Sequence, residues 1–135
     1  MPKLRANGVT LHYEDSGGDG TPIVFSHGLL FSGAMFEAQA RALSPRFRCI
    51  RYDHRGQGQS ADPGGRLHTI ENCYADAVAL IEALGVAPCH FAGLSMGGFV
   101  GMRIAARRPE LLNRWSLSTA RPTLSRKRIL AAIAC

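Results

Sequence analysis

The sequence predicts an α/β fold, with a mostly parallel sheet and flanking helices, on two observations. Segments with the pattern of a strand alternate three times with segments that have the pattern of a helix. Residues 22–25 form a short, continuously apolar run, which is typical of a parallel strand buried on both faces. Strands of this kind are joined by right-handed crossovers through helices. With 135 residues and 46% hydrophobic content, the chain suits one domain with a modest core.

The first half of the chain contains three strand candidates and one helix candidate. Residues 9–14 alternate apolar and polar side chains, as a half-exposed strand does, and a turn rich in Gly and Asp follows over 15–20. The buried strand at 22–25 leads into a helix over roughly 33–42. Residues 47–52 are the next strand candidate.

The second half repeats the alternation. Thr69 is placed to cap a helix that ends where Gly85 suits a left-handed stop. A strand at 89–92 and a helix over 98–108 come next, and Pro109 ends that helix. The apolar positions that recur at helical spacing in the first of these two helices are Tyr74, Ala77, Val78, Ile81 and Leu84.

The pattern weakens from residue 112 onward. Residues 114–118 hold only two large apolar side chains, in alternation, which indicates either an edge strand or an irregular tail. Leu124, Ile129, Leu130 and Ile133 have the spacing of one amphipathic terminal helix. We therefore divide the chain into residues 1–112, the N-terminal part of an α/β domain, and residues 113–135, a basic tail that is irregular or helical.

The net charge of +6 belongs to the end of the chain. Residues 1–100 hold 8 Lys and Arg against 9 Asp and Glu, whereas residues 101–135 hold 8 against 1. The cluster 126–128 has no aromatic residues interleaved with it and no nucleic-acid motif around it. We interpret it as a solvated basic tail and expect no nucleic-acid partner.

The composition further predicts a cytoplasmic protein. No apolar run approaches the length of a membrane helix, and none follows the basic residues 1–5, so we expect no membrane association and no secretory signal. The four cysteines, Cys49, Cys73, Cys89 and Cys135, have no CxxC pair and no metal-ligand spacing. We expect them to be reduced thiols, and we expect neither a metal nor a cofactor.

The most informative motif is Gly93-Leu94-Ser95-Met96-Gly97, which lies between a strand candidate and a helix candidate. In a sharp strand-to-helix turn the central Ser stands at the tip, and a Cβ at either flanking glycine would collide with neighbouring backbone. The helix N-terminus presents unpaired N–H groups there. We therefore predict that Ser95 is a nucleophile and that the Met96 N–H is one donor to the oxyanion formed at an attacked carbonyl.

A second motif, His27-Gly28-Leu29, directly follows the buried strand at 22–25. A loop at this point reaches the same end of the sheet as Ser95, so the Leu29 N–H is the expected second oxyanion donor. Gly28 lets the backbone approach closely. We interpret His27 as a residue that packs the loop and takes no part in acid–base chemistry.

A third motif is the loop Asp53-His54-Arg55-Gly56-Gln57-Gly58-Gln59-Ser60. Asp53 and Arg55 are expected to tie loops together by charge-assisted hydrogen bonds, as scaffold of the site. We expect His54 to be exposed.

Together the three motifs, in this order, resemble the α/β-hydrolase superfamily over about residues 5–112. The branch that is most similar holds small serine esterases, cofactor-free haloperoxidase-like enzymes and 3-oxoadipate enol-lactonases. The resemblance implies Ser95 as nucleophile, the N–H groups of Leu29 and Met96 as oxyanion hole, and a small ester or lactone as substrate. It also implies a supporting role around the site for His27, Gly28, Asp53, Arg55, Gly93 and Gly97.

The chain departs from the family beyond Ser95. The family orders its triad as Ser, then Asp or Glu, then His, but here all five histidines precede Ser95 and Glu110 is the only later carboxylate side chain. A substitute base would need to reach about 2.6–3.2 Å from the hydroxyl, and only the loop of His27 is expected near it. We thus expect an incomplete α/β-hydrolase fold without the C-terminal strands and lid, with weak or no turnover alone.

Two other interpretations stay open on the sequence. One is a non-catalytic interaction module, or half of a split hydrolase, that associates with itself or with a complementing C-terminal fragment through an unpaired sheet edge. The other keeps the fold and changes the reaction, to that of a cofactor-free haloperoxidase or a lyase.

Overall fold

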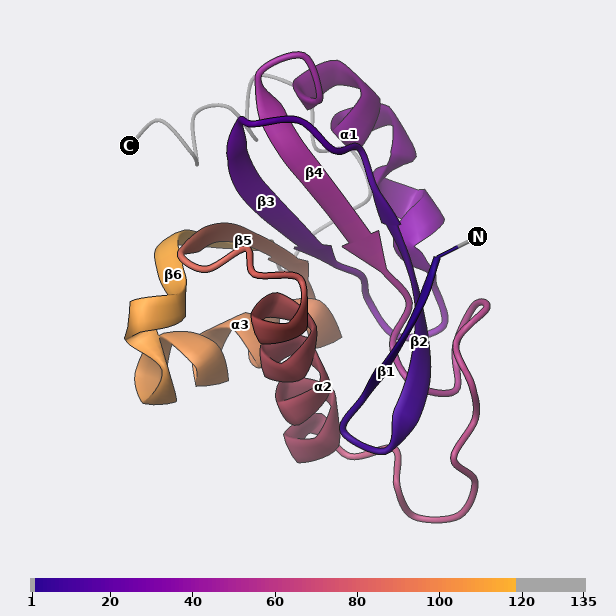
Figure 1. Cartoon of the computed structure of the whole chain (residues 1–135). Helices are drawn as coiled ribbons and strands as arrows, with labels where there is room; N and C mark the ends of the chain where they lie inside the picture. Colours follow the sequence, from indigo (N-terminus) through magenta and orange to yellow (C-terminus); the bar gives the residue numbers. More distant parts are fainter. Residues whose placement is uncertain (1, 119–135) are drawn as a thin grey trace.

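The computed structural model describes residues 2–118 as an α/β fold (Figure 1). Six strands form one sheet in the order β1-β2-β4-β3-β5-β6. β4, β3, β5 and β6 are parallel, whereas β1 and β2 pair antiparallel with each other and β2 with β4. The bounds are β1 Lys3–Ala6, β2 Val9–Asp15, β3 Thr21–Ser26, β4 Phe47–Tyr52, β5 Cys89–Leu94 and β6 Leu112–Ser118. The predicted mostly parallel sheet with flanking helices is confirmed.

Helices cover both faces of the sheet. The 3-10 turn η1 (Gly33–Phe36) and helix α1 (Glu37–Leu43) pack on one face, and α2 (Ile70–Ala83) and α3 (Met96–Arg107) pack together on the other. A second 3-10 turn, η2 (Pro109–Leu111), leads into β6. The segment predicted as one helix over 33–42 is thus a 3-10 turn followed by a short α-helix, because the Ser32 side chain caps a tight first turn at Ala34 N.

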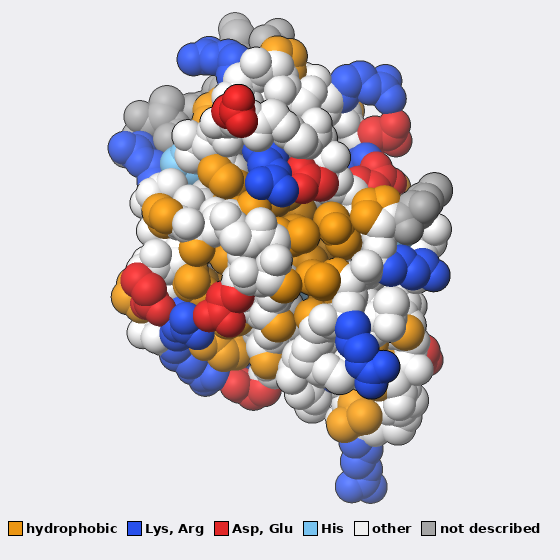
Figure 2. Space-filling view, viewed as in Figure 1, with side chains coloured by type: hydrophobic (Ala, Val, Ile, Leu, Met, Phe, Trp, Pro, Cys, Tyr) orange, Lys and Arg blue, Asp and Glu red, His pale blue; other side chains and the backbone are white. Residues whose placement is uncertain are grey.

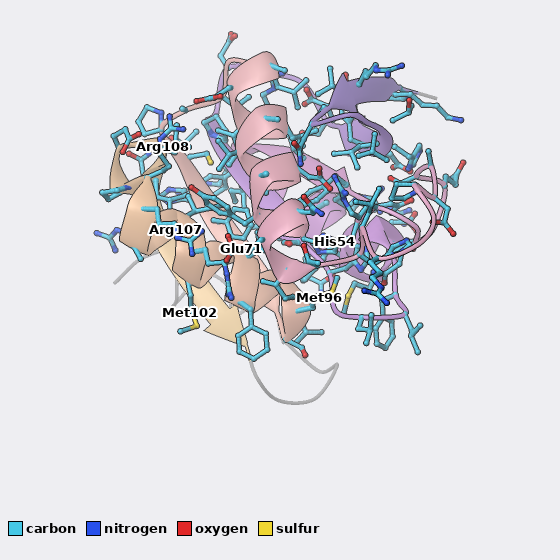
Figure 3. The ribbon with its side chains drawn as sticks, turned by 90° about the horizontal axis from the view of Figure 1, so that it is seen from below. His54, Glu71, Met96, Met102, Arg107 and Arg108 are labelled. Atoms are coloured by element: carbon cyan, nitrogen blue, oxygen red, sulfur yellow. The ribbon has the colours of Figure 1, made fainter. Side chains whose placement is uncertain are left out.

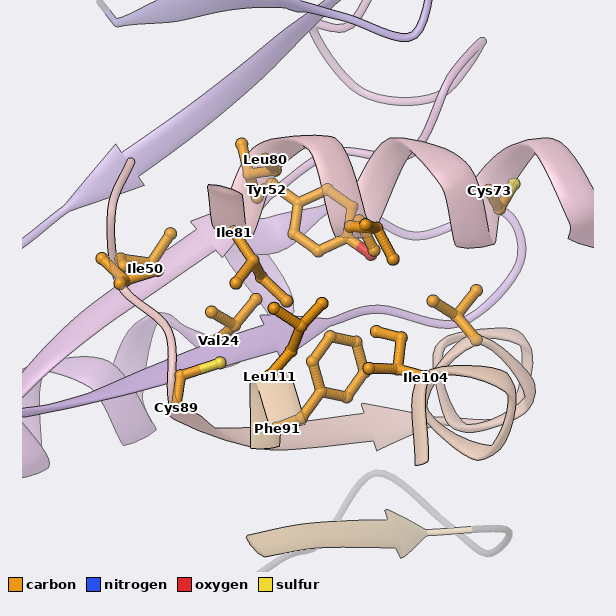
Figure 4. Packing of buried hydrophobic residues seen from close by; sticks show 14 residues of the cluster. Val24, Ile50, Tyr52, Cys73, Leu80, Ile81, Cys89, Phe91, Ile104 and Leu111 are labelled. Carbon is orange, nitrogen blue, oxygen red and sulfur yellow. The ribbon is translucent and has the colours of Figure 1, made fainter. Parts of the chain in front are cut away.

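β3 is buried on both faces, as its apolar run predicts. Ile23 and Phe25 point to the α1 side, where Phe36 and Leu43 cover them. Val24 points to the larger cluster under α2 and α3 (Figure 4). Each apolar side chain buried in this way contributes roughly 1.5–3 kcal/mol to folding. Other members of the larger cluster include Ile50, Tyr52, Leu80, Ile81, Phe91, Val100 and Ile104.

Local signals explain where α2 begins and how it is held. The Thr69 side chain accepts a hydrogen bond from Asn72 N at 3.1 Å, so the predicted cap is present. Gly85 has φ of 62° just beyond the helix, in the region that favours glycine. Glu71 on α2 pairs with Arg103 and Arg107 on α3, across the surface where the two helices meet (Figure 3).

Two segments differ from the sequence-based expectation. The sequence does not predict β1, because four residues of mixed polarity carry no strand signal until β2 pairs with them. Residues 113–118 belong to β6 and not to a tail, since they pair in parallel with β5 at one edge of the described sheet. The edge-strand interpretation is therefore the one that the structure supports. The rest of the expected tail, with its terminal helix, lies outside the described residues.

The surface mixes charge with apolar side chains. Figure 2 shows apolar atoms gathered in the middle of one face, with basic and acidic side chains around them. Within residues 2–118, no helix combines the length and apolar character that crossing a membrane requires.

Candidate active site

Ser95 occupies a sharp turn between β5 and α3. Leu94 ends the strand, Met96 begins the helix, and Ser95 between them has φ of 49° and ψ of −110°. A positive φ is rare for a residue with a Cβ, and such strain persists only where the surroundings enforce it. Ser95 is exposed, and its side chain does not form a hydrogen bond that caps the helix.

The glycines on either side of Ser95 make this turn possible. A Cβ at Gly93 would lie 2.4 Å from the carbonyl oxygen of Gly97. A Cβ at Gly97 would lie 2.0 Å from the carbonyl oxygen of Ser26, at the end of β3. Both are the backbone collisions expected from the sequence, and the second also shows that the start of α3 rests against the end of β3.

The start of α3 is also an electropositive end. Its first turn carries no acidic side chain, so the helix dipole and the N–H groups there are not neutralised by a neighbouring carboxylate. The Met96 N–H stands at this end, directly after Ser95. The start of α3 therefore provides an environment that favours negative charge beside Ser95.

The loop after β3 reaches the same place. A Cβ at Gly28 would lie 3.6 Å from the carbonyl oxygen of Leu94, so this backbone passes beside the residue that precedes Ser95. Gly28 O accepts hydrogen bonds from His27 Nδ1 at 2.6 Å and from Phe31 N at 3.2 Å. The structure thus brings together the motif His27-Gly28-Leu29 and the turn at Ser95.

Both ring nitrogens of His27 are engaged in holding this loop. Nε2 lies 2.9 Å from the His54 N–H and accepts from it, so Nδ1 carries the proton that goes to Gly28 O. His27 is fully buried, and burial lowers its pKa. Because neither nitrogen has a lone pair free for the Ser95 proton, the geometry gives His27 a packing role and not that of a base.

The expectation that His54 is exposed is wrong. Its side chain is fully buried beneath the loop after β3, where Nε2 lies 3.1 Å from both His27 O and Ser26 Oγ. Ser26 Oγ also lies 2.9 Å from the Tyr52 hydroxyl. Burial, and then the neighbouring His27, lower the pKa of His54 to about 3, so the network is neutral at ordinary pH. Its polar sequence context gives no hint of burial; its place directly after a buried strand is the usable signal.

The Asp53 carboxylate links three segments. Oδ1 accepts from Gly33 N at 2.7 Å, and Oδ2 accepts from Gln59 N at 2.8 Å and lies 3.1 Å from His12 Nδ1. The start of η1, the loop after β4 and strand β2 are thereby joined at one buried point. A Cβ at Gly58 would lie 2.3 Å from this carboxylate, which explains the glycine there.

Arg55 anchors the loop after β4 to α2. Its guanidinium forms two hydrogen bonds with the Asp76 carboxylate, at 2.7 and 2.6 Å, and both side chains are buried. It also donates to the backbone carbonyls of Leu67 and Asn7. The sequence singles out Arg55 but misses Asp76, since nothing in a helix pattern marks an acidic residue that faces inward.

The remaining histidines are engaged away from Ser95. His12 pairs with Asp53, His68 pairs with Asp62 at 2.8 Å, and the ring of His90 packs against that of Phe47. The site therefore has a candidate nucleophile and candidate oxyanion donors, without a general base from the described residues. Among residues 2–118, no group of three or more His, Cys, Asp or Glu is arranged to hold a metal ion.

Comparison with known proteins identifies the class to which this fold and site belong. The family described as the alpha/beta hydrolase fold matches residues 21–127. The chain belongs to that family.

The relatives it resembles are about twice as long. A putative carbamate hydrolase, RutD, from Caulobacter sp. (strain K31) is 37% identical over 107 residues, which are 77% of this chain and 40% of the relative. A putative non-heme bromoperoxidase, BpoC, from Mycobacterium tuberculosis (strain H37Rv) is 36% identical over 122 residues, 89% of this chain and 45% of the relative. The crystal structure of the enol-lactonase from Burkholderia xenovorans LB400 superposes with a TM-score of 0.79 at 40% identity, covering 84% of this chain and 45% of that one. The chain thus spans less than half of each of these three proteins.

Proposed function

We propose that Ser95 is the nucleophile of a hydrolase that acts on small carboxylic esters or lactones through an acyl-enzyme. One observation carries the proposal: an exposed serine at φ of 49°, between a strand and a helix N-terminus, beside the backbone of Gly28. A serine that only capped the helix would have no need of this strained, exposed position.

In the proposed reaction the Ser95 oxygen attacks the substrate carbonyl carbon and its proton passes to a base. The carbonyl oxygen becomes an anion that accepts hydrogen bonds from Leu29 N–H and Met96 N–H. Collapse of this intermediate breaks the bond to the alcohol oxygen, which takes up the proton, and leaves an ester on Ser95. Water then attacks that ester and releases the acid.

The base is what this chain does not supply. All five of its histidines precede Ser95, and the described ones lie in other hydrogen bonds or ring contacts. Without a base Ser95 has the weak nucleophilicity of an ordinary alcohol. We therefore expect slow Ser95-dependent acylation and little turnover from this chain by itself.

The relatives support the acyl chemistry in general. An enol-lactonase and a putative carbamate hydrolase, by their names, act on carbonyl groups bearing an oxygen or nitrogen leaving atom. We carry over only the acyl centre, whose carbonyl oxygen the backbone donors of the site suit. We place esters and lactones first because they are the substrates that the resemblance of the three motifs implies.

The test is hydrolysis of p-nitrophenyl acetate with imidazole as an external base. We expect the chain to release p-nitrophenol faster than its Ser95→Ala variant, and the difference to grow with imidazole concentration. The variant also measures the reaction of imidazole itself. Equal rates at every imidazole concentration would overturn Ser95 as nucleophile. Rapid Ser95-dependent turnover without imidazole would overturn the statement that the base is missing.

A second candidate, half of a split hydrolase, is favoured by the position of β6 at an edge of the described sheet and by the length of the relatives. Co-expression with a polypeptide that holds the later strands, an Asp and a His of such a relative tests it. Restored esterase activity supports this candidate, whereas two chains that do not associate on size exclusion contradict it.

A further inference from the structure

We propose that Gln57 is a positioning residue for the oxyanion hole, because its side chain holds the peptide group that follows Leu29. This inference rests on the proposed function of Leu29 as an oxyanion donor. The observation behind it is a hydrogen bond between loops, in which Leu30 N donates to Gln57 Oε1 at 2.8 Å. Gln57 is 27 residues further along the chain, in the loop after β4.

The backbone conformation of Leu30 requires a stabilising contact. Its φ is 64°, a left-handed conformation that is unfavourable for an L residue with a Cβ. Its side chain is 86% exposed, so burial of that side chain does not stabilise the conformation. The hydrogen bond to Gln57 connects this strained residue to a second loop of the molecule.

Gln57 itself stands on a fixed turn. Its backbone N–H donates to His54 O at 3.0 Å, and its carbonyl accepts from Ser60 N at 3.1 Å. Asp53 braces the same turn through Gln59 N. The side-chain oxygen of Gln57 is therefore presented to Leu30 at the surface from a turn that three hydrogen bonds hold.

The hydrogen bond completes the restraint on Leu29. On one side, Gly28 O is held by His27 Nδ1 and Phe31 N. On the other, Leu30 N is held by Gln57 Oε1. In a trans peptide the N–H points opposite to the carbonyl, so a fixed Gly28 carbonyl also fixes the direction of the Leu29 N–H. With both flanking peptide groups held, this donor is oriented before a substrate arrives.

The same contact decides which amide is left for the substrate. The Leu30 N–H is already engaged, so the loop offers the Leu29 N–H to an oxyanion. The variant Gln57→Glu separates two effects of this side chain. Its carboxylate still accepts a hydrogen bond from Leu30 N, but it brings a negative charge to the edge of the oxyanion site.

The experiment uses phenylboronic acid on the full chain and on three variants. Boron accepts an electron pair from the Ser95 oxygen, the hydroxyl proton goes to solvent, and a tetrahedral boronate anion results in the place of an oxyanion. Affinity is measured by 11B NMR, and exchange of the Leu30 amide with water by 15N-edited NMR. The variants are Gln57→Ala, Gln57→Glu and, as a matched control in the same loop, Gln59→Ala, since only the backbone of Gln59 bonds to Asp53.

We expect Gln57→Ala to weaken boronate binding by about threefold to tenfold, and to speed Leu30 exchange by a similar factor, the effect of losing one ordinary hydrogen bond. Gln57→Glu should keep the slow Leu30 exchange but lose boronate affinity, a split that a purely structural role would not give. Gln59→Ala should match the unmodified chain in both measurements.

Two results would overturn the inference. If Gln57→Ala binds boronate as tightly as the unmodified chain, or leaves Leu30 exchange unchanged, Gln57 does not position the hole. If Leu30 exchange depends on Gln57 but no boronate adduct forms on Ser95 in any variant, the proposed function fails and takes the role of Gln57 in the hole with it. The two failures are distinguishable because exchange and binding are measured separately.

Discussion

The loops that follow β3 and β4 differ in what they expose and what they bury. The first has an apolar, exposed tip, where Leu29, Leu30 and Phe31 are 58%, 86% and 52% exposed. The second buries its polar residues Asp53 and Arg55, each less than 5% exposed. The side chains of Asp53 and Gln57, in the loop after β4, accept hydrogen bonds from the backbone of the segment after β3. The comparison teaches that in this site the proposed chemistry belongs to backbone N–H groups and Ser95, while polar side chains keep them in place.

The two buried charged groups of the β4 loop, Asp53 and Arg55, are tolerable because each is paired. The Asp53 carboxylate receives two backbone N–H groups, and the Arg55 guanidinium is matched by the Asp76 carboxylate. Burial of an unpaired charge would cost several kcal/mol, so loss of one partner is far more damaging than loss of both.

The largest effect is expected where the Ser95 turn rests on β3. In Gly97→Ala the new Cβ would lie 2.0 Å from the carbonyl oxygen of Ser26, so backbone must move. We expect a loss of about 5 kcal/mol in the free energy of unfolding, the exceptional class of point mutation, measured by urea denaturation. Gly28→Ala is the matched control, because its Cβ meets only ordinary contacts from 3.6 Å outward. Similar stabilities for the two variants would contradict the packing of the turn described above.

The next effect tests the anchor of the β4 loop. Asp76→Ala leaves the Arg55 guanidinium buried without its partner, and we expect it to lower the free energy of unfolding by about 3–5 kcal/mol. The double variant Arg55→Met with Asp76→Leu removes both charges and should recover more than half of that loss. A single variant that loses less than about 1 kcal/mol would show that water reaches Arg55 and that the pair is not a buried anchor.

A smaller effect is expected from the neutral His27 and His54 pair. Burial lowers the pKa of both in the folded state, that of His54 to about 3, while the unfolded chain takes up a proton at the ordinary value of 6.5. The unfolded state therefore binds more protons below pH 6.5, and stability is fully present above that pH and declines as pH falls toward 3.

We expect His54 to lower the free energy of unfolding by up to about 1.4 kcal/mol per pH unit as the pH falls from about 6.5 to 5. His27, whose pKa is lowered in the same direction, adds to this fall. His54→Gln should flatten this dependence, and His68→Gln, which alters an exposed histidine, should leave it in place. Urea denaturation at several pH values measures this pH dependence of the free energy of unfolding. An undiminished slope in His54→Gln would contradict the contribution of His54 to the pH dependence.

Much of the framework is predictable from the sequence. The apolar run at 22–25 and the glycines around Ser95 have direct physical causes, burial on two faces and backbone contact, and each can be inferred from local residues. The Thr69 cap and the Gly85 stop are local in the same sense.

The features that the sequence does not reveal depend on partners far along the chain. His54 is buried because β3 and its loop lie over it, and Asp76 faces inward because Arg55 arrives from another loop. Gln57 acquires its proposed role only when Leu30 lies opposite. Strand β1 forms only because β2 pairs with it. The pattern of neighbouring residues in the sequence does not reveal these contacts between distant segments.

The central claim is that Ser95 stands beside backbone donors that are already oriented. A crystal structure of the chain with phenylboronic acid tests it most directly. The account predicts a bond from boron to Ser95 Oγ, with one boronate oxygen within hydrogen-bond distance of both Leu29 N and Met96 N. A boronate on Ser95 whose oxygens contact solvent alone, or a Ser95 that continues the regular turns of α3, would contradict it.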